Sequence, residues 1–482
     1  MPESSRWQAA LSAATSAAYS EIDAATFTSL VSVKQEGRNA LKTSNSFAVA
    51  TAAVVALLAS PTAAQPSGAL GAPRASTGAA GAAQPTAAGA GQQQALGLAG
   101  GRIHAALGFG NTFLVTTRDG NVVIDTSSPV PARRHRELLR AVSTAPVRYI
   151  VLTHAHGDHV GGLPLWREAG TKVVEQANSV EFRNYQVRLA GFFQVRNAAQ
   201  FGTDLDVRRA EANPGNFAAP VLADILFDKE TVFKVGDLTF RVIATPGETP
   251  DHATVWIPEL KAAFVGDNFY DSFPNLYTLR GTQPRLALDY VESIDKVLAL
   301  GPEIMLPSHG QPVVGTERVR TELAKYRDAI LYVHDATVRG MNEGKDVFTL
   351  MREIRLPPEL DVGEGYGQIA WSVRGIYEGY AGWFDGDAAN MYPVSPAEAE
   401  GELARLAGGP DAVAERARAV LADGKAAMAL RLTSAALAAD PKNAAALDVR
   451  KRALQKLLAD SRNSNESGWL RAAIARADAA LK

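Results

Sequence analysis

Four side chains that can bind metal ions fall within one six-residue stretch, HAHGDH, and this cluster restricts the fold more than any other feature. The stretch follows an apolar run at 147–152 that predicts a buried strand. His154 and His156 leave the end of this strand on the same side, because side chains alternate along an extended segment, so both can bind one ion. Asp158 and His159 follow a glycine that lets the chain turn back towards a second ion. The pattern predicts a site for two metal ions, with a histidine-rich surface turn as the alternative.

The composition restricts which ligands and partners the chain can use. It has no cysteine and only eight histidines in 482 residues, so a metal ion must be held by His, Asp and Glu. Imidazole and carboxylate groups suit zinc and other divalent ions. The 49 basic and 51 acidic residues leave a formal net charge of −2, which argues against nucleic acid or an anionic membrane surface as a partner.

Residues 1–65 are predicted to be an N-terminal extension with a signal peptide. An apolar run from Phe47 to Ala59 follows a basic approach and ends in small residues, the layout of a secretory signal. The run is shorter than the ~20 residues of a membrane span. We therefore expect export to the periplasm or the medium and no stable span in the mature chain, with an anchor or a buried helix as alternatives. Residues 66–101, rich in Ala, Gly, Pro and Gln, predict a flexible linker.

The segment 102–316 is predicted to form the catalytic domain. It opens with a strand, an Asp-Gly turn and a second strand over 110–126, followed by a helix over 133–143. Three later apolar runs predict buried strands, and each is followed by a side chain that can bind metal. These side chains are Glu248 or His252 after 238–244, Asp267 after 262–266, and His309 after 304–307.

The order of these motifs resembles the metallo-β-lactamase superfamily. The resemblance implies an α/β fold, the αββα sandwich, with two Zn2+ ions or another divalent metal. It implies that the first ion is held by His154, His156 and Glu248, the second by Asp158, His159 and His309, and that Asp267 bridges both. Many superfamily members have histidine where this chain has Glu248. His252, four residues further on, is therefore a rival ligand.

Two further stretches resemble the alkyl sulfatase branch of that superfamily. The first is NLYTLRG at 275–281, in which the resemblance implies that Arg280 and Asn275 bind the sulfate group. A planar guanidinium suits a tetrahedral oxyanion because it offers two parallel donors and keeps its charge. A surface salt bridge is the alternative role for Arg280. The second stretch, 366–386, resembles the alkyl sulfatase dimerisation domain, so we expect an all-α region over 317–482 and a homodimer.

Two other patterns concern packing. The stretch 426–457 has apolar residues at helical spacing around a D-P-x-N turn, which predicts tetratricopeptide-like helix pairs that need a further helix or subunit to bury their core. The stretch 179–200 carries four aromatic residues, which predict either ordinary core packing or an apolar wall over the substrate cleft. We expect His104, His135 and His334 to be structural or exposed.

The function predicted from these motifs is zinc-dependent hydrolysis of alkyl sulfate esters by a metal-activated hydroxide. Asp158, Asp267 and Arg280 are the predicted catalytic residues. One alternative is hydrolysis of another ester, a lactone, a lactam or a phosphodiester at the same site. A second is a non-catalytic helical-repeat protein that binds a partner and keeps a relic metal site.

Overall fold

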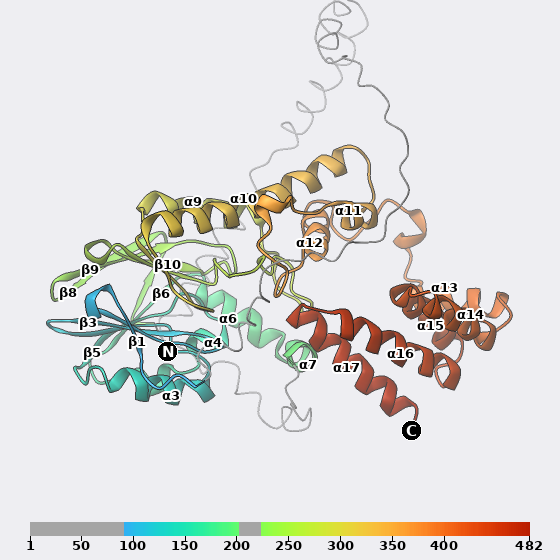
Figure 1. Cartoon of the computed structure of the whole chain (residues 1–482), viewed down its shortest axis with the longest axis horizontal. Helices are drawn as coiled ribbons and strands as arrows, with labels where there is room; N and C mark the ends of the chain where they lie inside the picture. Colours follow the sequence, from blue (N-terminus) through green and yellow to red (C-terminus); the bar gives the residue numbers. More distant parts are fainter. Residues whose placement is uncertain (1–90, 202–222) are drawn as a thin grey trace, which may run out of the picture. The chain divides into compact units, whose positions relative to one another are not determined.

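The computed structural model describes residues 91–201 and 223–482 (Figure 1). The predicted signal peptide and most of the predicted linker lie outside these residues. The end of that linker differs from the prediction, because Leu96–Leu98 forms a strand, β1, that pairs with the next strand. Gln92 also accepts a hydrogen bond from the Leu107 amide at 2.9 Å. The first sheet therefore begins several residues before residue 102.

Two mixed sheets form the centre of the catalytic part. The first has seven strands in sequence order, antiparallel from β1 to β4 and parallel from β4 to β7. Its further strands are β2 (Ile103–Ala106), β3 (Thr112–Thr117), β4 (Gly120–Ile124), β5 (Val147–Val151), β6 (Lys172–Gln176) and β7 (Ile225–Phe227). The predicted first hairpin is confirmed as β3 and β4, whose turn places Gly120 at φ +128°.

The second sheet has six strands in the order β13-β12-β11-β10-β9-β8. These are β8 (Glu230–Val235), β9 (Leu238–Ala244), β10 (Ala253–Ile257), β11 (Ala262–Gly266), β12 (Ile304–Pro307) and β13 (Val313–Val314). β9 alternates buried and half-buried side chains along its first five residues, as expected of a strand with one face in the core. The three strands predicted before Glu248, Asp267 and His309 are thus present as β9, β11 and β12.

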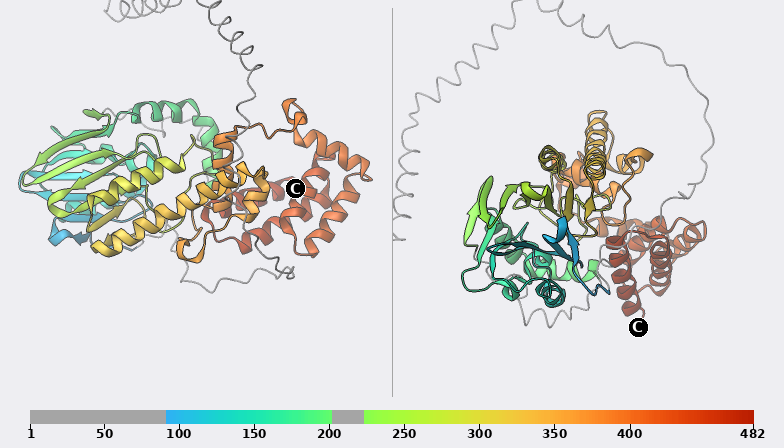
Figure 2. Two further views of the ribbon diagram at one scale, coloured as in Figure 1. Left: turned by 90° about the horizontal axis from the view of Figure 1, so that it is seen from above. Right: turned by 60° about the vertical axis from the view of Figure 1, so that its left-hand side comes forward.

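The sheets face each other, and helices cover both outer faces (Figures 1 and 2). Between the sheets the Phe113 and Phe264 rings meet edge to face, with centroids 5.2 Å apart. α3 (Pro129–Arg140) and α5 (Leu163–Trp166) cover the first sheet, and α9 (Ala287–Leu300) and α10 (Thr316–Asn342) cover the second. This arrangement is the predicted αββα sandwich.

Two predicted helices have different bounds in the structure. The helix predicted at 133–143 begins at Pro129, because proline at the first helical position needs no amide partner, and it ends at Arg140. The aromatic stretch at 179–200 forms two helices, α6 (Ser179–Arg188) and α7 (Ala190–Phe201), with Leu189 between them. A further short helix, α4 (Gly157–Val160), lies within the metal motif.

The C-terminal part is all helical. Its helices are α11 (Val347–Glu353), α12 (Ile369–Ala381), α13 (Pro396–Leu406), α14 (Pro410–Ala422), α15 (Ala426–Ala439), α16 (Ala444–Asp460) and α17 (Ser464–Ala480). The helix pair predicted over 426–457 is α15 and α16, and α13 and α14 bury its small side chains. α17 packs on both α16 and α7.

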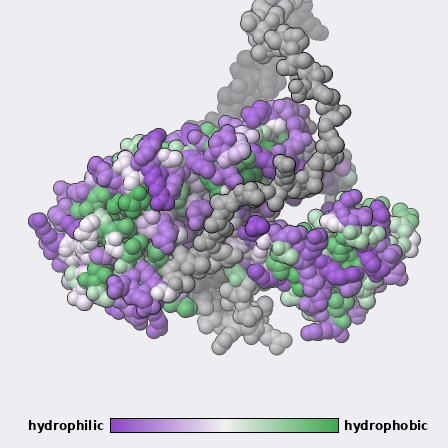
Figure 3. All heavy atoms as spheres, in the orientation of Figure 1, coloured by the Kyte–Doolittle hydropathy of each residue, from purple (hydrophilic) through white to green (hydrophobic). Residues whose placement is uncertain are grey.

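The hydrophobic core that covers the second sheet contains residues from both sides of the predicted domain boundary at residue 316. Met305 of β12 lies in one cluster with Leu323 and Ile330 of α10 and with Val373 of α12. No described helix is long and apolar enough to cross a membrane. On the face drawn in Figure 3, hydrophobic residues lie in groups between hydrophilic ones.

Candidate metal centre

Six predicted metal ligands meet at one edge of the sandwich, where β5, β11 and β12 end. They form two groups whose ligand atoms lie within 4.8 Å of one another: His154, His156 and Asp267, and Asp158, His159 and His309. All are buried except Asp158, which is half-buried. Three separate segments of the chain thus supply donors of the type that zinc prefers.

Asp267 lies between the two groups. Its Oδ2 atom is 3.7, 3.5 and 3.2 Å from the Nε2 atoms of His154, His159 and His309. The Tyr270 hydroxyl donates to the same oxygen at 2.8 Å. The preceding Gly266 has φ +54° and turns the chain so that the carboxylate faces the histidines. The position is the one expected of a bridging carboxylate.

Some polar atoms of this cluster have no hydrogen-bond partner within the described residues. They include His159 Nε2 and Asp267 Oδ1, and both are buried. The His154 Nε2 and His156 Nδ1 atoms approach each other to 2.9 Å. Buried polar atoms rarely remain unpaired. The donor set and its unpaired atoms therefore fit divalent metal ions.

Charge within the cluster favours ionised carboxylates. Burial alone would raise the pKa of Asp267, but His309, His159 and His154 outweigh burial and hold it well below its ordinary value. Burial lowers the pKa of His309, yet Asp267 and Asp158 raise it to about 10. The site is thus built around negative charge that attracts cations.

Asp125 fixes the orientation of this cluster, and sequence analysis missed it. Its Oδ2 lies 3.0 Å from His159 Nδ1 and accepts hydrogen bonds from Thr153 Oγ1 at 2.8 Å and from Ser308 Oγ at 2.7 Å. Asp125 is fully buried and has φ +52°, in the left-handed region. A carboxylate on the far nitrogen sets the tautomer and orientation of a histidine ligand. The signal was an acid that ends a buried strand, as at Asp267.

His252 has no nitrogen free for a metal ion. Its Nε2 accepts a hydrogen bond from the Asp267 amide at 3.0 Å, and its Nδ1 lies 3.2 Å from Thr245 Oγ1. The ring is fully buried. His252 thus supports the backbone of Asp267.

Glu248 lies beside the first group of ligands. Its Oε1 is 3.8 Å from His156 Nδ1. Its Oε2 accepts hydrogen bonds from Arg285 and, at 2.8 Å, from the Tyr290 hydroxyl. Burial raises the pKa of Glu248 and Arg285 opposes that effect. One oxygen is therefore paired within the protein and the other faces the cluster, which leaves Glu248 as the better-placed of the two rival ligands.

A cavity of 640 Å³ opens onto the metal ligands. Its wall includes Phe182, Tyr185 and Phe193 of α6 and α7, so these aromatic residues form an apolar wall as well as core. Phe192 instead is half exposed. Phe109 packs edge to face on His309, with ring centroids 5.3 Å apart. The wall can exclude water from a substrate and bind an apolar group.

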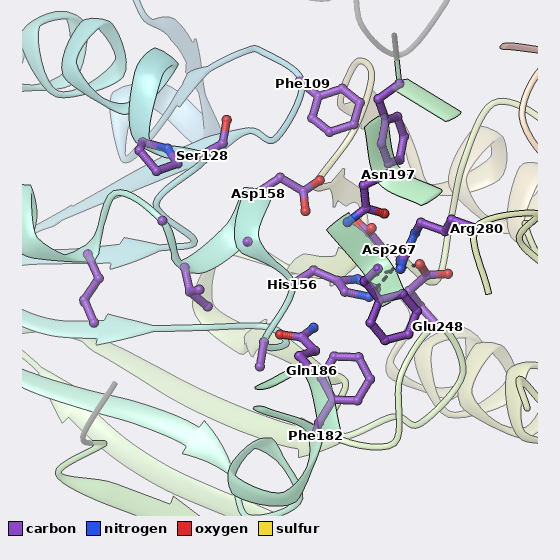
Figure 4. A pocket seen from close by; sticks show the side chains of 18 of the residues that line it. Phe109, Ser128, His156, Asp158, Phe182, Gln186, Asn197, Glu248, Asp267 and Arg280 are labelled. Atoms are coloured by element: carbon purple, nitrogen blue, oxygen red, sulfur yellow. Dashed lines mark hydrogen bonds and ion pairs between the residues drawn. The ribbon is translucent and has the colours of Figure 1, made fainter. Parts of the chain in front are cut away.

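Arg280 points into this cavity with His156, Glu248 and Asp267 (Figure 4). Its Nη2 atom lies 3.4 Å from His156 Nε2, and no carboxylate pairs with it in the described part of the chain. The guanidinium therefore faces the site without the salt bridge considered as an alternative. Asn275 is buried and is not in the cavity wall, and its carbonyl accepts a hydrogen bond from Arg285 at 2.8 Å.

The other three histidines lie away from the site, as expected. His104 is half-buried and contacts the Gly101 carbonyl at 2.9 Å, and His135 is buried against Thr112. His334 lies 2.8 Å from the Tyr380 hydroxyl.

Comparison with known proteins gives first the class and then the family. The Metallo-beta-lactamase superfamily matches residues 105–309, and the Alkyl sulfatase dimerisation family matches residues 349–477. A linear primary-alkylsulfatase of a Pseudomonas species is 32% identical over 383 residues, which cover 74% of this chain and 72% of that protein. An (R)-specific secondary-alkylsulfatase, also from Pseudomonas, is 28% identical over 378 residues, 72% of this chain and 57% of that protein.

A solved structure agrees with these matches. The stereoselective inverting sec-alkylsulfatase from Pseudomonas superimposes with a TM-score of 0.71 at 25% identity, covering 78% of this chain and 64% of that one. The chain thus spans between 57% and 72% of the length of these relatives. The protein belongs to the alkyl sulfatase family of the metallo-β-lactamase superfamily.

Proposed function

We propose that the protein is a dinuclear zinc-dependent alkyl sulfatase, which uses water to convert an alkyl sulfate ester into an alcohol and hydrogen sulfate. The observation that supports this most is the meeting of three features in one cavity. These are the two groups of metal ligands, the guanidinium of Arg280, which pairs with no carboxylate of the described residues, and the aromatic wall of α6 and α7.

The ions would be held as the sequence predicts. His154, His156 and Glu248 would hold one, Asp158, His159 and His309 the other, and Asp267 would bridge them. When bound, two zinc ions lower the pKa of a coordinated water to about 7 and stabilise negative charge on substrate oxygens.

The protein's own groups bind and orient the ester. Arg280 can donate two parallel hydrogen bonds to the sulfate oxygens and neutralise part of their charge. Phe182 and Phe193 give the alkyl chain an apolar surface and keep bulk water away. Asp125 keeps His159 oriented.

Export and dimerisation complete the proposal. The signal-like segment Ser46–Gln65 supports a periplasmic or secreted protein. An enzyme in either place would meet alkyl sulfates before they enter the cell. The match of 349–477 to the dimerisation family supports a homodimer.

The test is sulfate release from 1-octyl sulfate by the zinc-loaded full chain. Asp267→Ala should abolish release and lower the zinc content. Arg280→Met should keep the zinc and lower kcat/KM about 100-fold, equivalent to ~2.7 kcal/mol, a reasonable loss for two charge-assisted hydrogen bonds. Arg133→Met, which removes an exposed arginine of α3, is the matched control and should behave as the unmodified protein.

Two results would lead to other functions. If the protein holds two zinc ions but releases no sulfate, the search moves to lactones, lactams and phosphodiesters. If gently purified protein holds no metal and takes none up, a helical-repeat binding protein with a relic site becomes the better explanation.

A further inference from the structure

Two side chains of α7 bind both backbone polar groups of Arg280. The Arg280 amide donates to Gln200 Oε1 at 2.8 Å, and its carbonyl accepts from Arg196 Nε at 2.6 Å. Arg196 also donates to the Leu279 carbonyl at 2.5 Å, and Gln200 Nε2 donates to Thr278 Oγ1 at 3.1 Å. Arg196 and Gln200 are four residues apart and share one face of the helix. Together they fix the backbone that carries the guanidinium.

α17 holds these two side chains in turn. Trp469 Nε1 donates to Gln200 Oε1 at 3.3 Å. The Arg196 guanidinium lies 5.1 Å from the centre of the Trp469 ring and 5.0 Å from that of Phe192, so both rings can stabilise its charge. α17, near the C-terminal end, thus contacts Arg196 and Gln200 of α7, and these two side chains bind the backbone of Arg280.

The contact between the two helices is backbone to backbone. A Cβ atom at Gly468 would lie 1.8 Å from the Gln200 carbonyl oxygen, so no side chain fits there. Gln200 and Thr278 are buried, at 2% and 0% exposure. Because solvent does not reach Gln200, a hydrogen bond that Gln200 loses is not replaced by water.

We propose that Trp469, Gln200 and Arg196 are positioning residues for Arg280, so that α17 sets the affinity of the cavity for the sulfate group. The inference rests on the proposed function, in which Arg280 binds that group. None of the three residues lies in the cavity wall, so each acts through Arg280 and not by touching the substrate.

The first test compares variants of Trp469 in the zinc-loaded full chain. Trp469→Leu removes the ring and its N–H and should raise KM for 1-octyl sulfate about tenfold, with kcat within twofold and two zinc ions retained. An interaction equal in the bound substrate and the transition state changes KM alone. Trp469→Phe keeps a ring over Arg196 and should recover most of the affinity. Arg471→Ala, at an exposed position of the same helix, is the control and should leave KM unchanged.

Binding of 1-octanesulfonate, which has the same anionic head but no ester bond, separates this inference from the proposed function. By calorimetry its Kd should rise about tenfold in Trp469→Leu and Gln200→Ala. Equal Kd values for these folded variants and the unmodified protein would overturn the inference. If the unmodified, zinc-loaded protein binds neither compound, the proposed function fails instead.

Amide hydrogen exchange tests the mechanical link whether or not the protein is a sulfatase. The peptide containing residues 278–281 should exchange at least tenfold faster in Trp469→Leu than in the unmodified protein, while peptides from β11 stay protected. Unchanged exchange in this peptide would contradict the positioning role.

Discussion

Glu248 and Arg285 form a buried ion pair at the edge of the metal centre, and both side chains are 2% exposed. As the predicted ligand in place of a histidine, Glu248 would add one negative charge to the centre. Arg285 offsets that charge. Burial lowers the pKa of Arg285, but the negative charge of Glu248 outweighs burial and raises this pKa above its ordinary value. The pair would leave the positive charge of bound ions largely available to the substrate.

We expect Arg285→Met to lower the free energy of unfolding by about 3–5 kcal/mol in the metal-free protein, because Glu248 is left buried without its partner. The loss should be smaller in zinc-loaded protein, since an ion that binds Glu248 supplies the missing charge. Urea unfolding with and without zinc measures both values. The double variant with Glu248→Gln should recover most of the metal-free loss. An equal loss with and without zinc would mean that Glu248 does not contact the metal.

At the scale of elements, α3 buries a titratable side chain against the first sheet. His135 is 3% exposed and lies 3.1 Å from Thr112 Oγ1 of β3. Burial lowers its pKa from 6.5 to about 4. The folded protein therefore keeps His135 neutral at a pH where the unfolded chain protonates it.

The pH dependence of the folded state's stability follows from this difference in the pKa of His135 between the folded and unfolded states. Between pH 6.5 and pH 4 the unfolded state binds more protons, so the folded state loses up to about 3 kcal/mol as the pH falls, and none above pH 7. His135→Gln should remove this loss. Chemical unfolding of both proteins at pH 7, 6 and 5 measures it, and parallel stability curves would contradict the assignment.

The sequence predicted those parts of the site that depend on local spacing. The predicted ligands His154 to His159 follow one strand, and Asp267 and His309 each follow an apolar run, so each was recognisable as a candidate from the sequence. That they meet was implied by the resemblance to the metallo-β-lactamase superfamily, because β5 lies in one sheet and β11 and β12 lie in the other. The choice between Glu248 and His252 as the ligand could not be predicted, because it depends on hydrogen bonds to the amide of Asp267 and to Arg285.

Contacts between distant elements could not be predicted. Trp469 and Gln200 are 269 residues apart, and no periodicity or motif relates them. The strand β1 was also missed, because a Leu-Gly-Leu sequence in an Ala- and Gly-rich segment forms a strand only when β2 offers its free edge.

At the scale of the whole molecule, the sandwich depends on helices beyond residue 316. Five of the side chains that α10 and α12 add to the core are Leu323, Ile330, Val333, Val373 and Ile376. Their burial at 1.5–3 kcal/mol each contributes about 8–15 kcal/mol, as much as the entire stability of a typical domain.

A chain that ends at Gly315 should therefore fail to fold, whereas one that ends at Val394 should keep the sandwich. Circular dichroism and thermal melting distinguish the two outcomes. The longer fragment also lacks α17, so it should bind 1-octanesulfonate more weakly than the full chain. A cooperative melting transition for the chain ending at Gly315 would refute the dependence.

The shared core also limits how a gene for such a protein can be rearranged over generations. A recombination event at residue 316 would join the sandwich of one protein to the C-terminal helices of another. The two parts of the hydrophobic core would then come from different proteins. Residues 382–395 join α12 to α13 and are all exposed in the single chain. Exchange of C-terminal segments between related genes should therefore have its viable crossover points in this stretch, downstream of the place where the two family matches part.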